Sequence, residues 1–72
     1  MSDPLARSVA TAIAQLRDLE LVKQPGSAEA IDWAEALTLV GADSAQGEPA
    51  RRTLGWAVKN REDLARAEAE LA

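Results

Sequence analysis

The clearest pattern of apolar and polar positions lies in the middle of the chain, where a helix start follows a helix stop. Gln24-Pro25-Gly26 predicts the end of the preceding element, because residues before proline avoid helical angles and glycine adopts unusual ones easily. Ser27 then predicts an N-cap. Apolar residues follow at steps of three and four, as in an amphipathic helix packed on a core. The stripe consists of Trp33, Ala34, Leu37 and Val40, with Ala30 and Ile31 at its flank.

The segment before this central helix predicts a first helix. Asp3 is the expected N-cap and Pro4 the first helical residue, and the helix should run to about Leu19. Leu21-Val22-Lys23 then predicts an irregular connector that is partly buried. The apolar face of the first helix collects Leu5, Val9, Ala12, Ile13 and Leu16.

The segment after the central helix predicts two further short helices. Gly41 suits the left-handed position that ends a helix, and a polar loop is expected over residues 42–47. Pro49 predicts the first position of a third helix, in which Gly55 suggests the close approach of another backbone, and Asn60 predicts the N-cap of a fourth. The apolar face of the third helix would be Ala50, Leu54, Ala57 and Val58, and that of the fourth Leu64, Ala67 and Leu71.

Composition favours an all-α fold. Alanine, a strong helix former, supplies nearly half of the hydrophobic residues, and Trp33 and Trp56 are the only aromatic ones. A chain of 72 residues forms one small domain with a thin core. We therefore expect a small four-helix bundle over residues 1–72, in which Trp56 is either the edge of the buried face or a contact for a partner. The predicted core is Ile13, Leu16, Ile31, Trp33, Leu37, Leu54 and Val58.

Two missing residue types restrict the chemistry. The chain has no cysteine and no histidine, which removes disulfides, thiolate metal sites and the commonest general base. We expect no catalytic residue, no metal site and no enzyme activity of this chain alone. The net charge of −4, with Arg51-Arg52 as the only adjacent basic pair, disfavours a nucleic-acid-binding helix-turn-helix. No apolar run predicts a membrane span or an export signal, so a cytoplasmic location is expected.

Three groups of charged residues and one turn are candidate sites. Glu29, Asp32 and Glu35 recur at steps of three on the central helix, where a solvated face is favoured over a metal or acid–base site. The same applies to Glu62-Asp63 as a helix start, with Arg66 expected to pair with Glu62 and Glu70. Arg51-Arg52 is expected to be solvated rather than bound to a phosphate. The turn Pro25-Gly26-Ser27 precedes a helix N-terminus, whose free N–H groups either approach a phosphate or bind water and a cap.

Two stretches of the chain carry distinctive motifs. Residues 21–37 contain Lys-x-Pro-Gly-x-Ala-Glu-x-x-Asp-Trp, and residues 51–63 contain Thr-Leu-Gly followed by Lys-x-x-Glu-Asp. Both motifs resemble the C-terminal lid of MoxR-type AAA+ ATPases, in the branch associated with carbon monoxide dehydrogenase maturation, and the match covers residues 5–64. The resemblance implies a four-helix AAA+ lid packed beside a nucleotide-binding α/β domain.

The resemblance also implies a larger parent protein. The phosphate-binding motif Gly-x-x-x-x-Gly-Lys-Ser/Thr does not occur in this chain. We therefore expect a domain excised from an ATPase, with a P-loop domain as its partner in the parent chain. ATP and magnesium are implied for the parent and no cofactor for the isolated domain. The parent is expected to be a homo-oligomeric ring that remodels complexes or inserts a metal or cofactor into a partner enzyme.

In AAA+ lids the start of the central helix faces the nucleotide and often carries a sensor-2 arginine. By position that arginine would fall near Ala28, where this chain has none, and Glu29 follows. A free-standing helical protein–protein interaction module, docking through a groove or through Trp56, is the alternative function. The residues that the resemblance brings near a nucleotide are Lys23, Pro25, Gly26, Ser27, Ala28 and Glu29.

Overall fold

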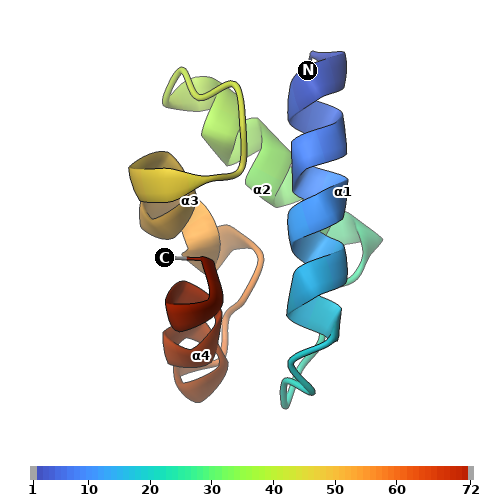
Figure 1. Cartoon of the computed structure of the whole chain (residues 1–72), viewed down its shortest axis with the longest axis vertical. Coiled ribbons are helices and arrows are strands. Elements are labelled where there is room, and N and C mark those ends of the chain that lie inside the picture. The colour runs from blue at the N-terminus through green and yellow to red at the C-terminus, as the bar shows by residue number, and fades with distance from the viewer. Residues whose placement is uncertain (1, 72) are drawn as a thin grey trace.

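Four α-helices and one turn of 3-10 helix make up the computed structural model, which describes residues 2–71 and, for Leu71, the backbone alone (Figure 1). No strand occurs among the described residues, so the expected all-α fold is confirmed. The radius of gyration is 10.7 Å, close to the roughly 11 Å of a compact chain of this length. The elements are α1 (Asp3–Arg17), α2 (Ser27–Leu39), α3 (Gly47–Thr53), η1 (Leu54–Trp56) and α4 (Arg61–Leu71).

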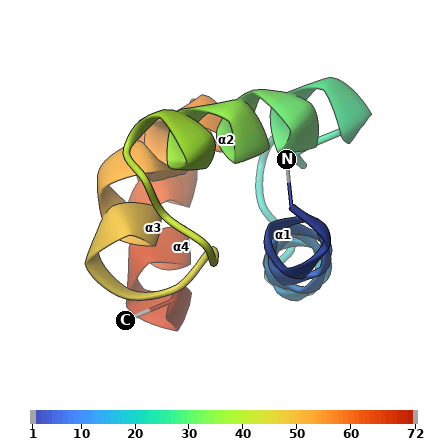
Figure 2. The same cartoon turned by 90° about the horizontal axis from the view of Figure 1, so that it is seen from above.

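The elements pack on one another in a ring. α1 packs on α2, α2 packs on α3 and η1, these two pack on α4, and α4 packs back on α1. Figure 2 shows α2 lying across one side of both α1 and the α3–α4 pair. In Figure 1, α1 and α4 run in opposite directions on the two sides of the molecule. No helix of the described chain combines the length and the apolar character needed to cross a bilayer.

The first helix keeps its predicted face but not its predicted ends. Ser2, not Asp3, is the N-cap, because the Ser2 hydroxyl accepts the Leu5 N–H at 3.3 Å. The helix ends at Arg17 rather than at about Leu19. All five apolar side chains predicted for its face are buried. The local pattern thus predicted the buried side of α1 correctly, but it did not predict the first and last residues of the helix.

The second helix differs from the expected stripe at both ends. Trp33, Ala34 and Leu37 are buried as expected, but Ile31 is 53 % exposed and Val40 is 47 % exposed. The prediction of Ile31 as a core residue is wrong because it precedes Trp33 by about 200° of helix rotation, which places it on the solvent side. Val40 follows the last helical residue and therefore leaves the line of the stripe.

A polar contact buried in the core joins α2 to α3. Trp33 is fully buried, and its indole Nε1–H donates to the Thr53 hydroxyl at 2.9 Å. That hydroxyl in turn donates to the Pro49 carbonyl at 2.7 Å. The indole therefore keeps a hydrogen bond in the core, where an unpaired donor would be costly. The remaining predicted core residues, apart from Ile31, are buried as well: Ile13, Leu16, Leu37, Leu54 and Val58.

The end of α2 follows the prediction closely. Gly41 has φ = +75°, a left-handed conformation that glycine adopts without strain. Its N–H donates to the Thr38 carbonyl at 3.0 Å, and the next N–H, of Ala42, donates to the Leu37 carbonyl at 2.9 Å. These two bonds form a Schellman motif, which satisfies carbonyls that the helix end would otherwise leave free.

The loop and third helix depart from expectation in three details. Within the predicted polar loop Ala45 is buried, and its N–H donates to the Ser8 hydroxyl on α1 at 2.7 Å. The helix begins at Gly47, so Pro49 is its third residue rather than its first. Gly55 is exposed and a Cβ added there would meet no atom within 4 Å, so the expected close backbone packing at Gly55 is wrong. All four apolar residues predicted for this face are buried, whereas Trp56 is 56 % exposed.

The fourth helix has the predicted cap but not the predicted ion pairs. The Asn60 side-chain oxygen accepts the N–H groups of Glu62 and Asp63 at 3.0 and 3.1 Å, which confirms Asn60 as the N-cap. Ala67 is fully buried and Leu64 half-buried, and the Leu71 side chain lies outside the described part. The expected pairs of Arg66 with glutamates are not formed. Among the described residues the single ion pair joins Arg51 to Glu48, 2.7 Å apart on the surface.

Candidate functional site

The six residues expected near a nucleotide all lie on the turn that leads into α2 or in the first turn of that helix. Pro25 is buried, which anchors the turn against the bundle, while Gly26 and Glu29 are half-buried. The other three candidates lie at the surface: Lys23, Ser27 and Ala28.

The N-terminal end of α2 is capped by the chain itself. Gly26, not Ser27, is the N-cap residue, and its N–H donates to Glu29 Oε1 at 2.8 Å. This backbone donor at the start of the helix is therefore already bound to a carboxylate of the same helix. A phosphate approaching it would have to displace the negative charge of Glu29.

Gly26 is not required by its backbone angles. Its φ of −97° and ψ of −168° are extended values that any residue adopts. A Cβ added there would lie 3.1 Å from Glu29 Oε1, closer than an ordinary van der Waals contact. Gly26 thus makes room for the Glu29 carboxylate, whereas its backbone angles do not require a glycine.

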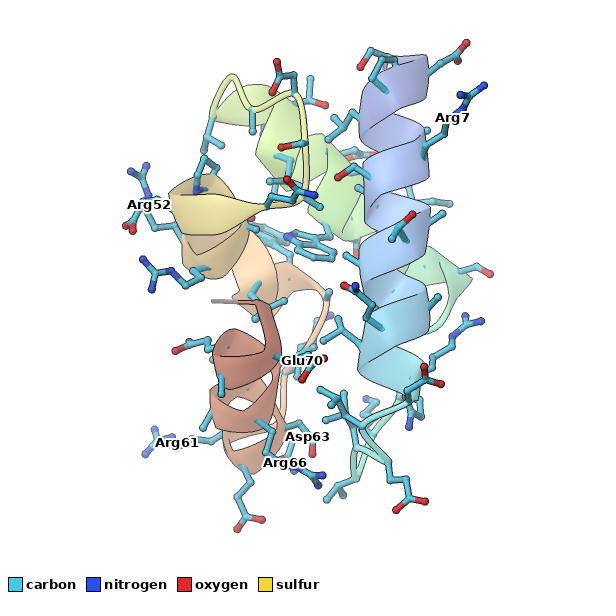
Figure 3. All side chains as sticks on the ribbon, viewed as in Figure 1. Arg7, Arg52, Arg61, Asp63, Arg66 and Glu70 are labelled. Carbon is cyan, nitrogen blue, oxygen red and sulfur yellow. The ribbon has the colours of Figure 1, made fainter. Side chains whose placement is uncertain are left out.

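A buried carboxylate from α4 anchors the connector before this turn. Asp63 is 1 % exposed; its Oδ1 accepts the Val22 N–H and its Oδ2 accepts the Lys23 N–H, both at 2.9 Å. Figure 3 shows Asp63 reaching from the lower end of α4 toward this connector. The prediction of a solvated acid at this helix start is wrong for Asp63. The contact joins residues 40 and 41 positions apart, and no local pattern separates Asp63 from its neighbour Glu62.

Arg66 holds the same connector one helical turn further along α4. Its Nη2–H donates to the Leu19 carbonyl at 2.7 Å, and in Figure 3 its side chain points the same way as that of Asp63. Glu20 lies between the residues bound by Arg66 and those bound by Asp63, and its φ of +54° is unusual for a residue with a Cβ. We call this group of contacts the α4 clasp: Asp63 and Arg66 with the backbone of Leu19, Val22 and Lys23.

Two lysines flank a small hollow beside the turn. The hollow has a volume of about 20 Å³, and Lys23, Lys59 and Glu29 are among the residues that line it. Lys59 comes from the segment before α4, and sequence analysis missed it because it is distant along the chain. A hollow of this size has room for about one water molecule and cannot enclose a nucleotide. The residues that line it could therefore contact only the edge of a ligand that is held elsewhere.

A much larger groove opens elsewhere on the molecule. It has a volume of about 730 Å³ and lies between α1, the loop before α3 and the end of α4. In Figure 3, Glu70 points from α4 toward α1 across this region. Its charged lining is mixed, with Arg7, Asp43 and Glu70, and none of the six candidate residues contributes to it. The groove and the α2 turn are separate features.

Neither the other charged candidates nor the large exposed apolar side chains line the hollow or the groove. Glu35 is exposed and Asp32 half-buried, and in the part of the chain that the structure describes no three acidic, cysteine or histidine side chains gather to hold a metal ion. Arg51 and Arg52 are both exposed, and Figure 3 shows Arg52 pointing away from the bundle. The large apolar side chains that are exposed are Val22, Ile31, Leu39, Val40 and Trp56.

Comparisons of this chain with protein-family models, with curated protein sequences and with solved structures find no significant match. The resemblance of residues 21–37 and 51–63 to an AAA+ lid therefore stays a prediction.

Proposed function

We propose that this chain is the helical lid of a MoxR-type AAA+ ATPase, which closes over a nucleotide held by the P-loop domain of a parent protein. The observation that carries the proposal is the anchoring of the turn before α2. Because Asp63 binds the Lys23 and Val22 amides, the turn is tied to α4 as well as to its own helix. A displacement at the turn would then be passed to the whole bundle, as rigid-body transmission of nucleotide state requires.

The lid would contribute contacts rather than catalysis. Glu29 occupies the Gly26 N–H and no arginine stands at Ala28, so side-chain contact to a phosphate would come from Lys23, before the turn, and from Lys59, before α4. An ammonium group binds phosphate as a point charge without a fixed geometry. ATP and magnesium would be held by the parent's P-loop domain, in a cytoplasmic homo-oligomeric ring that remodels complexes or inserts a metal or cofactor.

Calorimetric titration with magnesium–ATP tests the first half of the proposal. The 72-residue chain should show no binding at millimolar or tighter affinity, because most contacts would lie in the P-loop domain. Binding or hydrolysis of ATP by the chain alone would contradict the proposal.

Steady-state ATP turnover tests the second half in a longer protein that carries this chain behind a P-loop domain. Lys23→Ala and Lys59→Ala should each lower turnover, because the ammonium groups approach the phosphates. Arg61→Ala is the matched control, since Figure 3 shows Arg61 pointing away from the bundle. Unchanged turnover in both lysine variants, or an equal loss in the control, would count against the proposal.

A free-standing protein interaction module is the second candidate. It is favoured by the exposure of Trp56 at 56 % and Leu39 at 86 %, and by the 730 Å³ groove beside α1. Large exposed apolar side chains are common at binding surfaces, and tryptophan is frequent among residues that dominate binding energy. The reading frame around this segment separates the two candidates: a P-loop domain favours the lid, and its absence favours the interaction module.

A further inference from the structure

We propose that the α4 clasp makes α4 and the connector before α2 a single opening unit, which undocks while the core of α1, α2 and α3 stays folded. This proposal concerns the chain itself and goes beyond the lid function, because it holds whether or not the parent is an ATPase. It follows from three features: the small apolar face of α4, the hydrogen bonds that Asp63 and Arg66 make to the connector, and the left-handed conformation of Glu20.

The apolar docking of α4 is slight. Among its described side chains Ala67 is fully buried and Leu64 only half-buried, and the other fully buried side chain is the carboxylate of Asp63. α2 in contrast buries a tryptophan and a leucine completely. Elements with little buried apolar surface open at lower free energy than the core. The docking of α4 therefore depends strongly on its polar contacts.

Those polar contacts all end on one segment of backbone. Asp63 accepts two N–H groups from Val22 and Lys23, and Arg66 donates to the Leu19 carbonyl. Bonds to ionised groups are stronger than those between neutral groups. When α4 leaves, two backbone amides and one carbonyl lose their partners at the same moment. The connector and α4 are thus expected to open together.

The conformation of Glu20 adds to this dependence. Its φ of +54° is disfavoured for a residue with a Cβ and persists only where the surroundings hold it. The backbone groups that α4 binds lie on both sides of Glu20: Leu19 precedes it, and Val22 and Lys23 follow it. Once α4 undocks, nothing among these bonds holds Glu20 in the left-handed region, so the connector relaxes. Conversely, a partner that fixes the turn before α2 would stabilise the docking of α4, since such coupling is reciprocal.

Native-state hydrogen exchange, measured by NMR on the full 72-residue chain, tests the proposal. The Val22 and Lys23 amides should exchange with the same opening equilibrium as the Ala67 amide inside α4. The Leu37 amide in α2 should exchange at least about tenfold more slowly, as expected for a more stable unit.

Two variants then perturb the clasp from α4. Asp63→Asn should speed exchange of the Val22, Lys23 and Ala67 amides together by about 10- to 100-fold, the range for losing a bond to an ionised group. Arg66→Gln removes the exposed hydrogen bond to the Leu19 carbonyl but keeps the buried Asp63 carboxylate. It should speed exchange of the same three amides by a smaller factor. Glu62→Gln, one position from Asp63, is the matched control and should leave all four amides unchanged.

A third variant perturbs the connector instead. Glu20→Gly removes the cost of the left-handed conformation and should slow exchange of the clasp amides and of Ala67 alike. Two results would overturn the proposal. In one, Val22 and Lys23 lose protection in the variants while Ala67 keeps it, so the two parts open separately. In the other, Leu37 changes as much as the rest, so that only global unfolding exposes the clasp.

Discussion

The bundle is held together in two different ways, one at α2 and one at α4. α2 buries Trp33 and Leu37 completely, and its polar contact to Thr53 serves to satisfy the indole N–H. α4 buries one alanine fully, and Asp63 and Arg66 bind the backbone of a distant connector. The first region follows from a local apolar stripe, whereas the second depends on side chains whose partners lie at least 40 residues away.

The comparison shows how a thin apolar core is supplemented. Burial of apolar area is the main stabilising term, but a chain of 72 residues has little of it to bury. Where apolar contacts are few, a carboxylate that accepts two backbone N–H groups fixes both the position and the orientation of its helix relative to the segment it binds. We therefore expect α2 to determine whether the chain folds, and α4 to determine how firmly the turn before α2 is held.

The largest effect is expected at the apolar centre. Trp33→Ala should lower the free energy of unfolding by about 3–5 kcal/mol, because it leaves a cavity and removes the partner of Thr53. A domain of this size has only about 4–11 kcal/mol in total, so little cooperative unfolding should remain. Thermal melting followed by circular dichroism measures this. A melt close to that of the parent chain would show that Trp33 is not the centre of the core.

The next largest effect is expected at the clasp. Asp63→Ala should cost about 2–3 kcal/mol, because two backbone N–H groups lose a buried, ionised acceptor. Glu62→Ala is the matched control and should stay within about 0.5 kcal/mol, since Glu62 is an exposed neighbour. Urea unfolding of both variants gives the two values. If Asp63→Ala and Glu62→Ala lowered the free energy of unfolding equally, the docking of α4 would not depend on the Asp63 carboxylate.

A smaller loss is expected where the two kinds of contact meet. Thr53→Val keeps the shape of the side chain but leaves the Trp33 Nε1–H without its acceptor in the core, at a cost of about 1–2 kcal/mol. Thr11→Val on α1 is the control, because the Thr11 hydroxyl is exposed and bonds only to its own helix. Chemical denaturation would refute the role of this bond if both variants had the same midpoint.

The smallest effect is expected on the outer side of α2. Ile31→Gln should change the free energy of unfolding by less than about 0.5 kcal/mol, because the side chain is 53 % exposed. The same change at Ile13, which is 5 % exposed, should destabilise the chain strongly and serves as the comparison. A large loss for Ile31→Gln would mean that the residue is covered in solution.

The apolar part of the fold was largely predictable from the sequence. The faces of α1 and of the segment from Ala50 to Val58 follow from helical periodicity, and Gly41 and Asn60 marked helix ends correctly. The errors were local. Ile31 belongs to no stripe once the helix phase is set by Trp33, and the true caps, Ser2 and Gly26, each lie one residue before the expected ones.

The polar part was not predictable, for a physical reason. Asp63 and Glu62 look alike as acids in a first helical turn, and only the docking of the connector decides which one is buried. Lys59 and Lys23 likewise meet only through the tertiary fold. Glu29 was expected on a solvated face, yet it caps its own helix by accepting the Gly26 N–H. The contacts of Asp63 and Lys59 depend on long-range geometry that periodicity does not contain, whereas Glu29 lies only three residues from its partner Gly26.

One carboxylate of α4 binds the connector before α2, and NMR couplings through hydrogen bonds test this contact without any substitution. At neutral pH the Val22 and Lys23 amide nitrogens should each show a coupling to the side-chain carboxyl carbon of Asp63, because the two bonds are 2.9 Å long. Both amides should also resist exchange with solvent. If neither coupling appears and both amides exchange as freely as in an unfolded chain, the account of α4 as a polar clasp is contradicted.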